Sequence, residues 1–237
     1  MKSIFNEIDV VILCGGKGTR LRPVVSDRPK SLAVIGDTTF LDILIESFTR
    51  GGFKHFILCV GYMKDQIKDH FKKRDGISII FSEEEEALGT GGALKNARSL
   101  IRSETFLVLN GDSICDLDFE KFYRFHKNKN AVLSILLVQT NQTEDFGSVM
   151  VNSSDQITSF KEKVANNADG LINAGIYLMQ QEIFSYMPKV NRFSLESDFF
   201  PKIIQEKCAG FIIKSELIDI GTPERYQKAV DFIRGRS

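Results

Sequence analysis

The stretch VVILCGGKGTRL, residues 10 to 21, joins a short apolar run to a loop rich in glycine and positive charge. The run Val10–Leu13 predicts a buried β-strand, because a short continuous apolar run bounded by a turn signal is typical of one. The three glycines that follow free the backbone to turn tightly and to direct several N–H groups at one place. Such a loop suits a polyphosphate, although a tight turn with surface cations explains the glycines equally well.

Two familiar glycine signatures are absent from this loop. A P-loop requires GxxxxGK[ST], and the dinucleotide motif GxGxxG requires glycine at position 21, where the chain has leucine. Pro29 and Lys30 follow shortly afterwards and place another cation within reach of the loop. This second cation shifts the balance from a structural turn toward an anion-binding site.

Apolar runs alternate with helical patterns through the first half of the chain. The predicted strands are Val10–Leu13, Phe56–Val60, Ile77–Phe81 and Phe106–Leu109, and the predicted helices are Phe40–Arg50, Lys64–Arg74, Ala93–Ile101 and Phe119–Lys127. Continuously apolar strands are typical of a mostly parallel sheet that is buried on both faces. The pattern predicts an α/β fold whose first half is Rossmann-like, a doubly wound nucleotide-binding half.

The second half has less room for helices. Four successive segments predict either strands added to the same sheet or a small mixed lobe, namely Val132–Val138, Ser148–Val151, Ile157–Lys161 and Ile172–Met179. Two helical stretches, Leu195–Glu206 and Pro223–Arg234, flank a last strand near Phe211–Ile213. Because no Pro-rich or Gly/Ser-rich linker divides the chain, we expect one domain over residues 1–237.

Composition argues against several classes of function. Lys plus Arg number 31, and so do Asp plus Glu, so no basic excess favours binding to nucleic acid or to a membrane surface. The four cysteines stand singly, without a CxxC pair, which argues against disulfides and zinc. No apolar run is long enough to span a bilayer. We expect a cytoplasmic protein whose partner is a small molecule or another protein.

Two more loops follow predicted strands. EEEEALGTGGAL, residues 83 to 94, opens a helix whose N-terminal amides and dipole favour a polar ligand edge, although a solvated acidic turn explains most of the glutamates. LNGDS, residues 109 to 113, places Asp112 just past the carboxyl end of a central strand, where open α/β sheets bind ligands. A hard carboxylate there is a natural magnesium ligand, and a plain Asn-Gly-Asp turn is the alternative.

Three further motifs lie in the second half, namely FKEKV at 160 to 164, INAGIY at 172 to 177 and LIDIGTPERY at 217 to 226. A lone Glu-Lys pair on a strand is usually a surface pair of small energetic value. In the last motif, Thr222 as N-cap and Pro223 at the first helical position explain the helix start. They do not explain why Asp219 lies among apolar residues.

Taken in order, these motifs resemble one family. GGKGTRLRP, RPKSLAVIG, LGTGGAL, NGD, EK, NAGIY and DIGTPERY are similar to the signature elements of the sugar-1-phosphate nucleotidyltransferases, from about Val10 to Ile233. The resemblance implies a glycosyltransferase-A-like α/β fold, with a mixed, mainly parallel central sheet and helices on both faces. A nucleotide-binding half would extend to about residue 115, and a sugar-phosphate-binding half over about 116–237. It implies a reaction between a nucleoside triphosphate and a sugar 1-phosphate that releases pyrophosphate.

The resemblance also implies roles for individual residues. The catalytic residues would be Arg20, Lys30 and Asp112, and the ligands of Mg²⁺ would be Asp112 and Asp219. The nucleotide would contact Cys14, Gly15, Gly16, Gly18, Thr19, Glu83 or a neighbouring glutamate, Leu88, Gly89, Thr90 and Gly91. The sugar phosphate would contact Gly111, Glu162, Lys163, Asn173, Gly175 and Glu196.

Within the family, RLRPVVSDRPKSLAVIG looks most similar to the branch that activates D-glycero-D-manno-heptose 1-phosphate with GTP for surface polysaccharide synthesis. Mannose 1-phosphate guanylyltransferases are near neighbours, and relatives that use UTP, CTP or dTTP share the phosphate-binding loop. Short members often form homodimers. Two other classes stay open: a glycosyltransferase that uses the spacing Asp116-Leu117-Asp118 to hold a metal, and a silent regulatory subunit, which would be expected to lose one of the catalytic residues.

Overall fold

The computed structural model describes residues 4–72, 74–141, 146–161, 170–204 and 206–234. Its main sheet has the order β10-β9-β11-β6-β1-β4-β5, with β8 pairing β11 and β12 pairing β8. These strands are β1 Asp9–Leu13, β4 His55–Val60, β5 Ser78–Glu83, β6 Thr105–Asn110, β8 Leu133–Thr140, β9 Ser148–Val151, β10 Ile157–Lys161, β11 Gly170–Gln180 and β12 Cys208–Ile213. The predicted mixed α/β sheet is confirmed.

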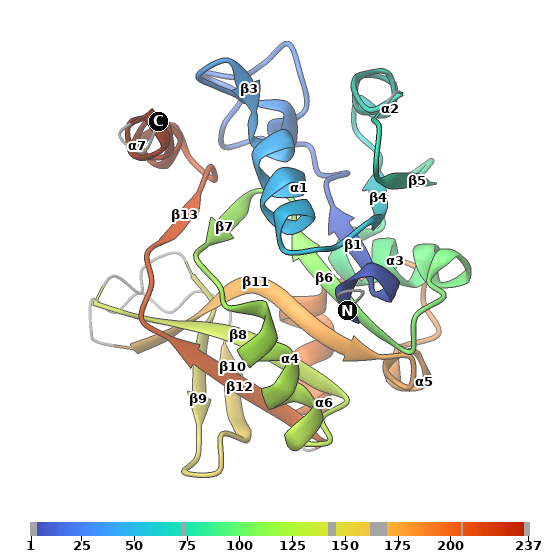
Figure 1. Cartoon of the computed structure of the whole chain (residues 1–237), viewed down its shortest axis with the longest axis vertical. Coiled ribbons are helices and arrows are strands. Elements are labelled where there is room, and N and C mark those ends of the chain that lie inside the picture. Colours follow the sequence, from blue (N-terminus) through green and yellow to red (C-terminus); the bar gives the residue numbers. More distant parts are fainter. Residues whose placement is uncertain (1–3, 73, 142–145, 162–169, 205, 235–237) are drawn as a thin grey trace.

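The parallel part of the sheet is formed by the first half of the chain. Strand β1 lies between β4 and β6 and runs parallel to both, and β4 runs parallel to β5. Strand β11 then pairs antiparallel with β6, β8 and β9. Because β1, β4, β5 and β6 all end at the same edge, the loops that follow them meet there (Figure 1).

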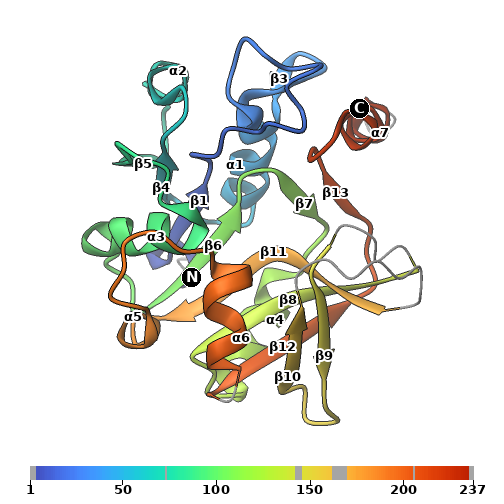
Figure 2. The ribbon, with the colours of Figure 1, turned by 180° about the vertical axis from the view of Figure 1, so that it is seen from behind.

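Helices cover both faces of the sheet. Helices α1 Phe40–Arg50, α2 Lys64–His70 and α4 Phe119–Asn128 contribute to one apolar core. Helices α3 Gly89–Asn96, α5 Ile183–Tyr186 and α6 Phe200–Ile203 contribute to the core on the opposite face, which Figure 2 shows from behind. The last helix, α7 Pro223–Arg234, packs with the start of α1 in a third, smaller cluster.

Short elements complete the chain. They are the 3₁₀ turns η1 Ile4–Glu7, η2 Lys30–Leu32 and η3 Ala97–Leu100, the π-helical turn η4 Leu195–Phe199, the hairpin of β2 Val34–Ile35 and β3 Thr38–Thr39, and the pair of β7 Ser113–Cys115 and β13 Leu217–Asp219. No helix in the described ranges is long and apolar enough to cross a bilayer. The four cysteines are free thiols.

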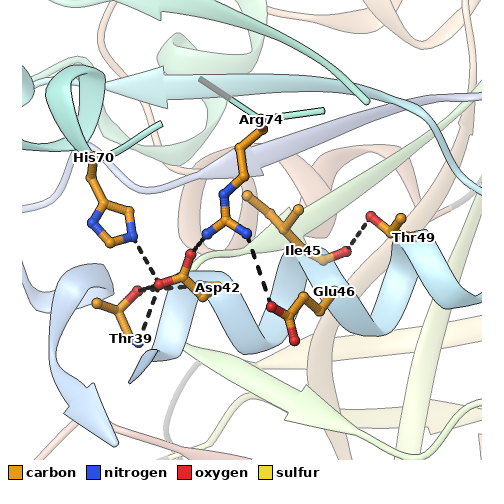
Figure 3. Close-up of polar contacts among 7 residues, drawn as sticks. All are labelled: Thr39, Asp42, Ile45, Glu46, Thr49, His70 and Arg74. Carbon is orange, nitrogen blue, oxygen red and sulfur yellow. Dashed lines mark hydrogen bonds and ion pairs between the residues drawn. The ribbon is translucent and has the colours of Figure 1, made fainter. Parts of the chain in front are cut away.

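A buried carboxylate ties α1 to the segment after α2. Asp42 accepts hydrogen bonds from the backbone N–H and the hydroxyl of Thr39, at 3.2 and 2.6 Å, and so caps the helix. The ring of His70 lies 2.8 Å from the same carboxylate, and Arg74 forms an ion pair with it (Figure 3). Asp42 is 4% exposed, so this charge is satisfied inside the protein.

Candidate active site

The loops at the carboxyl edge of the parallel strands surround a cleft of about 480 Å³. Its walls come from the glycine loop after β1, the segment after β4, the acidic run after β5 and the turn after β6. The lining residues include Cys14, Gly15, Gly16, Gly18, Lys30, Glu84, Gly89, Thr90, Asn110, Gly111 and Asp112. The structure therefore brings together most of the predicted nucleotide-binding residues with two of the predicted catalytic ones.

The glycine loop is anchored at its start. The backbone N–H of Cys14 donates to the carbonyl of Cys59 at 3.1 Å, and that of Tyr62 donates to the carbonyl of Gly15 at 3.0 Å. Within the described part of the chain, the amides of residues 16 to 18 donate no hydrogen bond. Unpaired amides in a cleft are suited to an anion. Cys14 is buried in the wall of the cleft, and burial raises the pKa of its thiol well above its usual range.

Lys30 approaches the loop closely. Gly18 has a φ of +58°, and a Cβ atom there would lie 2.7 Å from the Cβ of Lys30. Glycine is therefore required at position 18 both for the left-handed backbone and for this approach. The ammonium of Lys30 lies 2.5 Å from a carboxylate oxygen of Asp112, and the Lys30 side chain is only 13% exposed. The predicted cation and the predicted metal ligand thus form an ion pair in the cleft.

The turn after Gly18 carries Thr19 and Arg20, whose side chains are exposed. Neither residue is among those that line the cleft in the described structure. The turn is closed by the N–H of Leu21, which donates to the carbonyl of Gly18 at 3.0 Å, and Leu21 itself is buried. The catalytic role of Arg20 stays a prediction.

Asp219 is held beside Asp112 by the backbone. Strands β13 and β7 pair so that Asp219 lies opposite Ser113, and the N–H of Ile220 donates to the carbonyl of Asp112 at 3.0 Å. The carboxylate of Asp219 accepts a hydrogen bond from the N–H of Gly221 at 2.8 Å. Burial raises the pKa of Asp219, and the charge of Arg225 opposes that shift. Asp219 lines a second cleft of about 620 Å³, on the α7 side.

The two aspartates fit a divalent cation that is shared with a substrate. In the described ranges no three His, Cys, Asp or Glu side chains gather as a metal cage. Mg²⁺ typically takes one or two carboxylates together with substrate phosphates, and Asp112 and Asp219 supply that number. Asp219 is partly buried, and Arg225, whose Nη1 atom lies 3.3 Å from its carboxylate, is its cationic partner in the structure.

A polar network extends from the cleft toward the second half of the chain. Glu196 accepts hydrogen bonds from the hydroxyls of Thr90 at 2.6 Å, Ser194 at 2.9 Å and Tyr177 at 3.1 Å. The side-chain amide of Asn173 donates to the hydroxyl of Tyr177 at 2.8 Å. The predicted sugar-side residues Asn173 and Glu196 therefore meet through Tyr177. Sequence reasoning missed Tyr177, although a tyrosine in an otherwise apolar strand signals a buried hydroxyl that needs partners.

Gly175 brings this network next to the cleft. It has a φ of +73°, and a Cβ atom there would lie 2.7 Å from the side-chain amide nitrogen of Asn110. Asn110 lines the cleft, and its Oδ1 atom is buried without a hydrogen-bond partner in the described part of the protein. Glu162 and Lys163, which we predicted to contact the sugar phosphate, lie outside the described residues.

The four glutamates at residues 83 to 86 lie in different environments. The carboxylate of Glu83 forms ion pairs with Lys64 and Lys68 and does not line the described cleft. Glu84 is buried and accepts a hydrogen bond from the N–H of Leu88 at 3.1 Å. Glu85 and Glu86 line the cleft, and Glu85 also forms an ion pair with Lys64.

The N-terminus of α3 is occupied from within the protein. The amides of Gly91 and Gly92 both donate to the carbonyl of Phe193, at 3.0 and 3.1 Å. Helix α3 consequently begins at Gly89, earlier than the predicted start at Ala93. Of the predicted nucleotide contacts in this segment, Gly89 and Thr90 line the cleft, whereas Leu88 and Gly91 do not line it in the described structure.

The Asp-x-Asp spacing at 116 to 118 has a structural explanation. The carboxylate of Asp118 accepts a hydrogen bond from the N–H of Lys121 at 3.0 Å and so caps α4. Neither aspartate lines the cleft in the described ranges. This arrangement removes the observation that favoured a glycosyltransferase.

The fold and the cleft define an enzyme class that handles nucleotides, and the chain belongs to the nucleotidyl transferase family, which it matches over residues 9–235. It is 39% identical to the D-glycero-alpha-D-manno-heptose 1-phosphate guanylyltransferase of Campylobacter jejuni, over 92% of this chain and 97% of that protein. The crystal structure of HddC from Yersinia pseudotuberculosis superimposes with a TM-score of 0.86 at 37% identity, covering 95% of this chain and 99% of HddC. HddC has also been crystallised with GMP-PN, and that structure gives a TM-score of 0.84 at 36% identity, covering 95% of this chain and 99% of that one. The predicted family is confirmed.

Proposed function

We propose that the protein transfers GMP from GTP to D-glycero-alpha-D-manno-heptose 1-phosphate, with release of pyrophosphate and with Mg²⁺ as the divalent cation. The observation that carries the proposal is the Lys30–Asp112 ion pair in the glycine-loop cleft. The pair lies beside loop amides that donate no hydrogen bond in the described part of the chain, and we assign Asp112 to the metal. The names of the Campylobacter relative and of HddC with its bound GMP-PN support GTP and heptose as the substrates.

The chemistry asks the protein to position two anions that repel each other. An oxygen of the sugar phosphate attacks the α-phosphorus of GTP, and pyrophosphate leaves from the opposite side. The nucleophile is already an anion at neutral pH, so no covalent enzyme intermediate is required. The unpaired amides of the glycine loop bind the triphosphate, and Lys30 neutralises charge at the reacting phosphates. We assign the same role to Arg20, whose exposed side chain is in the turn after the loop.

The cation is held by Asp112 and Asp219 in this proposal. Mg²⁺ bound there supplies neutralisation of the negative charge on the phosphate oxygens. The chain's own contribution is to fix the two carboxylates relative to each other, through the β7–β13 pair and the hydrogen bond from Ile220 to Asp112. Lys30 forms an ion pair with Asp112 in the structure.

Recognition of the two substrates falls to opposite sides of the cleft. Guanine presents an N1–H and an exocyclic amine, which call for a carboxylate acceptor. Of the acidic run, Glu86 is the exposed lining residue that forms no ion pair in the described structure, and we assign it this role ahead of Glu83. On the sugar side, we assign the contacts with the hydroxyls to Asn173 and Glu196, whose positions Tyr177 fixes.

One panel tests the proposal. Purified protein with Mg²⁺ is mixed with each of GTP, ATP, CTP, UTP and dTTP, against heptose, mannose and glucose 1-phosphates, and pyrophosphate release is measured. We expect the largest kcat/KM with GTP and the heptose phosphate. A preference for mannose 1-phosphate would replace the sugar assignment alone, and a preference for a pyrimidine nucleotide would replace the guanine assignment. Absence of pyrophosphate with every pair would refute the enzymatic function.

Two variants separate the halves of the site. Asp112→Asn removes a proposed metal ligand and should abolish turnover with any substrate pair. Asn173→Ser should leave the KM for GTP unchanged and raise the KM for the sugar phosphate. The opposite pattern would mean that the metal and sugar sites have been exchanged. A cytoplasmic location and a homodimer remain proposals that cell fractionation and light scattering would test.

A further inference from the structure

Arg225 is a cation in an unfavourable place on its helix. It is the third residue of α7, and its N–H donates to the hydroxyl of the N-cap Thr222 at 3.4 Å. The N-terminus of a helix carries partial positive charge, so a cation in the first turn is disfavoured. Stability of α7 therefore does not account for an arginine at this position.

The contacts of Arg225 point instead to Asp219. Its Nη1 atom lies 3.3 Å from each of the two carboxylate oxygens of Asp219. The guanidinium also lies over the ring of Phe146, with Cζ 4.3 Å from the ring centroid. The side chains of Arg225 and Asp219 are only 21% and 12% exposed. Arg225 is thus held in place on one side by an aromatic ring and on the other by the proposed metal ligand.

The geometry points to Arg225 as a positioning residue that orients Asp219 for the divalent cation from the side of the second cleft. This inference rests on the proposed function, because it requires Asp219 to be a metal ligand. Groups that hydrogen-bond to a metal ligand fix its orientation, and their loss typically lowers metal affinity by 10- to 100-fold. The N–H of Gly221 already holds Oδ1 at 2.8 Å, so Arg225 fixes the rotation of the carboxylate about that anchor. Phe146 stacking fixes Arg225 in turn.

The sign of the effect distinguishes this role from simple electrostatics. Arg225 is a positive charge close to a cation site, so its removal would strengthen cation binding if charge alone mattered. A positioning role predicts the opposite sign. A merely structural role predicts a loss of stability without a specific change in cation affinity.

The experiment measures Mn²⁺ binding to the full chain by the electron paramagnetic resonance of free Mn²⁺, with GMP-PNP present in all samples. We expect Arg225→Met to weaken Mn²⁺ binding about tenfold and Arg225→Lys to rescue it only in part, because lysine keeps the charge but not the planar group. Lys228→Met is the matched control: it removes a cation from the same helix and the same cleft and should change the affinity less than about twofold.

The Asp219→Asn variant distinguishes failure of the proposed metal site from failure of the positioning role of Arg225. If Asp219→Asn binds Mn²⁺ as the wild type does, Asp219 is not a ligand and the proposed metal site fails. If Asp219→Asn loses Mn²⁺ while Arg225→Met binds it normally or more tightly, the positioning role is refuted and the metal site stands. Thermal unfolding is recorded for every variant. Should Arg225→Met fail to fold, Phe146→Leu provides the test, because it leaves both charged residues in place and should still weaken Mn²⁺ binding.

Discussion

Replacement of Gly18 by alanine tests how the glycine-rich loop is built. Gly18 has a φ of +58°, and the new Cβ would lie 2.7 Å from the Cβ of Lys30. A left-handed backbone costs a residue other than glycine about 1 to 2 kcal/mol. Overpacking against an atom close to the main chain costs about 1 to 3 kcal/mol more. We therefore expect Gly18→Ala to lower the free energy of unfolding by about 2 to 5 kcal/mol.

Two other glycines separate these contributions. Gly36 has a φ of +62°, and a methyl group at this position would meet no atom within 4 Å, so Gly36→Ala should show the backbone cost alone. Gly16 has neither a left-handed backbone nor an atom within 4 Å of where its methyl group would lie. Gly16→Ala should leave stability unchanged or raise it by up to about 1 kcal/mol, because alanine reduces the entropy of the unfolded chain.

Urea unfolding, followed by circular dichroism, gives the three free energies, and steady-state kinetics give the functional effect. Because Gly16 lines the cleft, its methyl group should obstruct the phosphates and raise the KM for GTP while the protein stays stable. Gly18→Ala should lower kcat as well, because it displaces Lys30 from Asp112. Equal stability losses for Gly18→Ala and Gly36→Ala would refute the contact with Lys30, and a wild-type KM for Gly16→Ala would refute the phosphate site.

Buried polar groups give three further predictions. His126 is fully buried, and burial lowers its pKa to about 4. Because the unfolded chain binds the proton more readily, the free energy of unfolding should fall by up to about 3 kcal/mol as the pH drops from 6.5 toward 4. In a series of urea midpoints measured over this pH range, His126→Gln should show a smaller decrease than the wild type. Asp42→Asn should lower the free energy of unfolding by about 2 to 3 kcal/mol, measured at pH 7, because the buried charge that meets Arg74 is lost. Glu196→Gln should raise the KM for the sugar phosphate without changing the KM for GTP. Thr90→Val removes only one of the hydroxyl groups that donate to Glu196 and should raise the KM for the sugar phosphate by a smaller amount.

Each of these predictions has an outcome that contradicts it. An unchanged pH slope in His126→Gln would show that other groups control the acid limb. A loss below about 0.5 kcal/mol in Asp42→Asn would show that its ion pairs are solvated like ordinary surface pairs. A higher KM for GTP in Glu196→Gln would place Glu196 on the nucleotide side of the cleft.

The local pattern of apolar residues was sufficient to predict most strands of the main sheet. The predicted strand Val10–Leu13 and helix Phe40–Arg50 agree with β1 and α1 to within one residue. The strand is a continuous apolar run and the helix combines an apolar period with a capping box, so local and global preferences coincide in both. The short strands β7 and β13 escaped prediction because three residues carry no readable period, and only their pairing with each other makes them strands.

The order of the motifs along the chain also determined the family, because each motif carries the residue types that phosphates, a metal or a sugar require. The sequence alone predicted the cation at Lys30 and the carboxylates at Asp112 and Asp219. It did not predict that Lys30 and Asp112 form an ion pair. It also did not predict that Glu83 forms ion pairs with two lysines, or that Tyr177 forms hydrogen bonds with both Asn173 and Glu196.

The start of α3 illustrates the physical reason. Glycines disfavour a helix by propensity, so the sequence predicts a start at Ala93, yet the carbonyl of Phe193 caps the amides of Gly91 and Gly92 from about a hundred residues away. Residue type and local spacing by themselves determined which chemical groups this protein possesses. Only the tertiary structure decided which of them meet, because contacts between distant segments depend on how the whole chain packs.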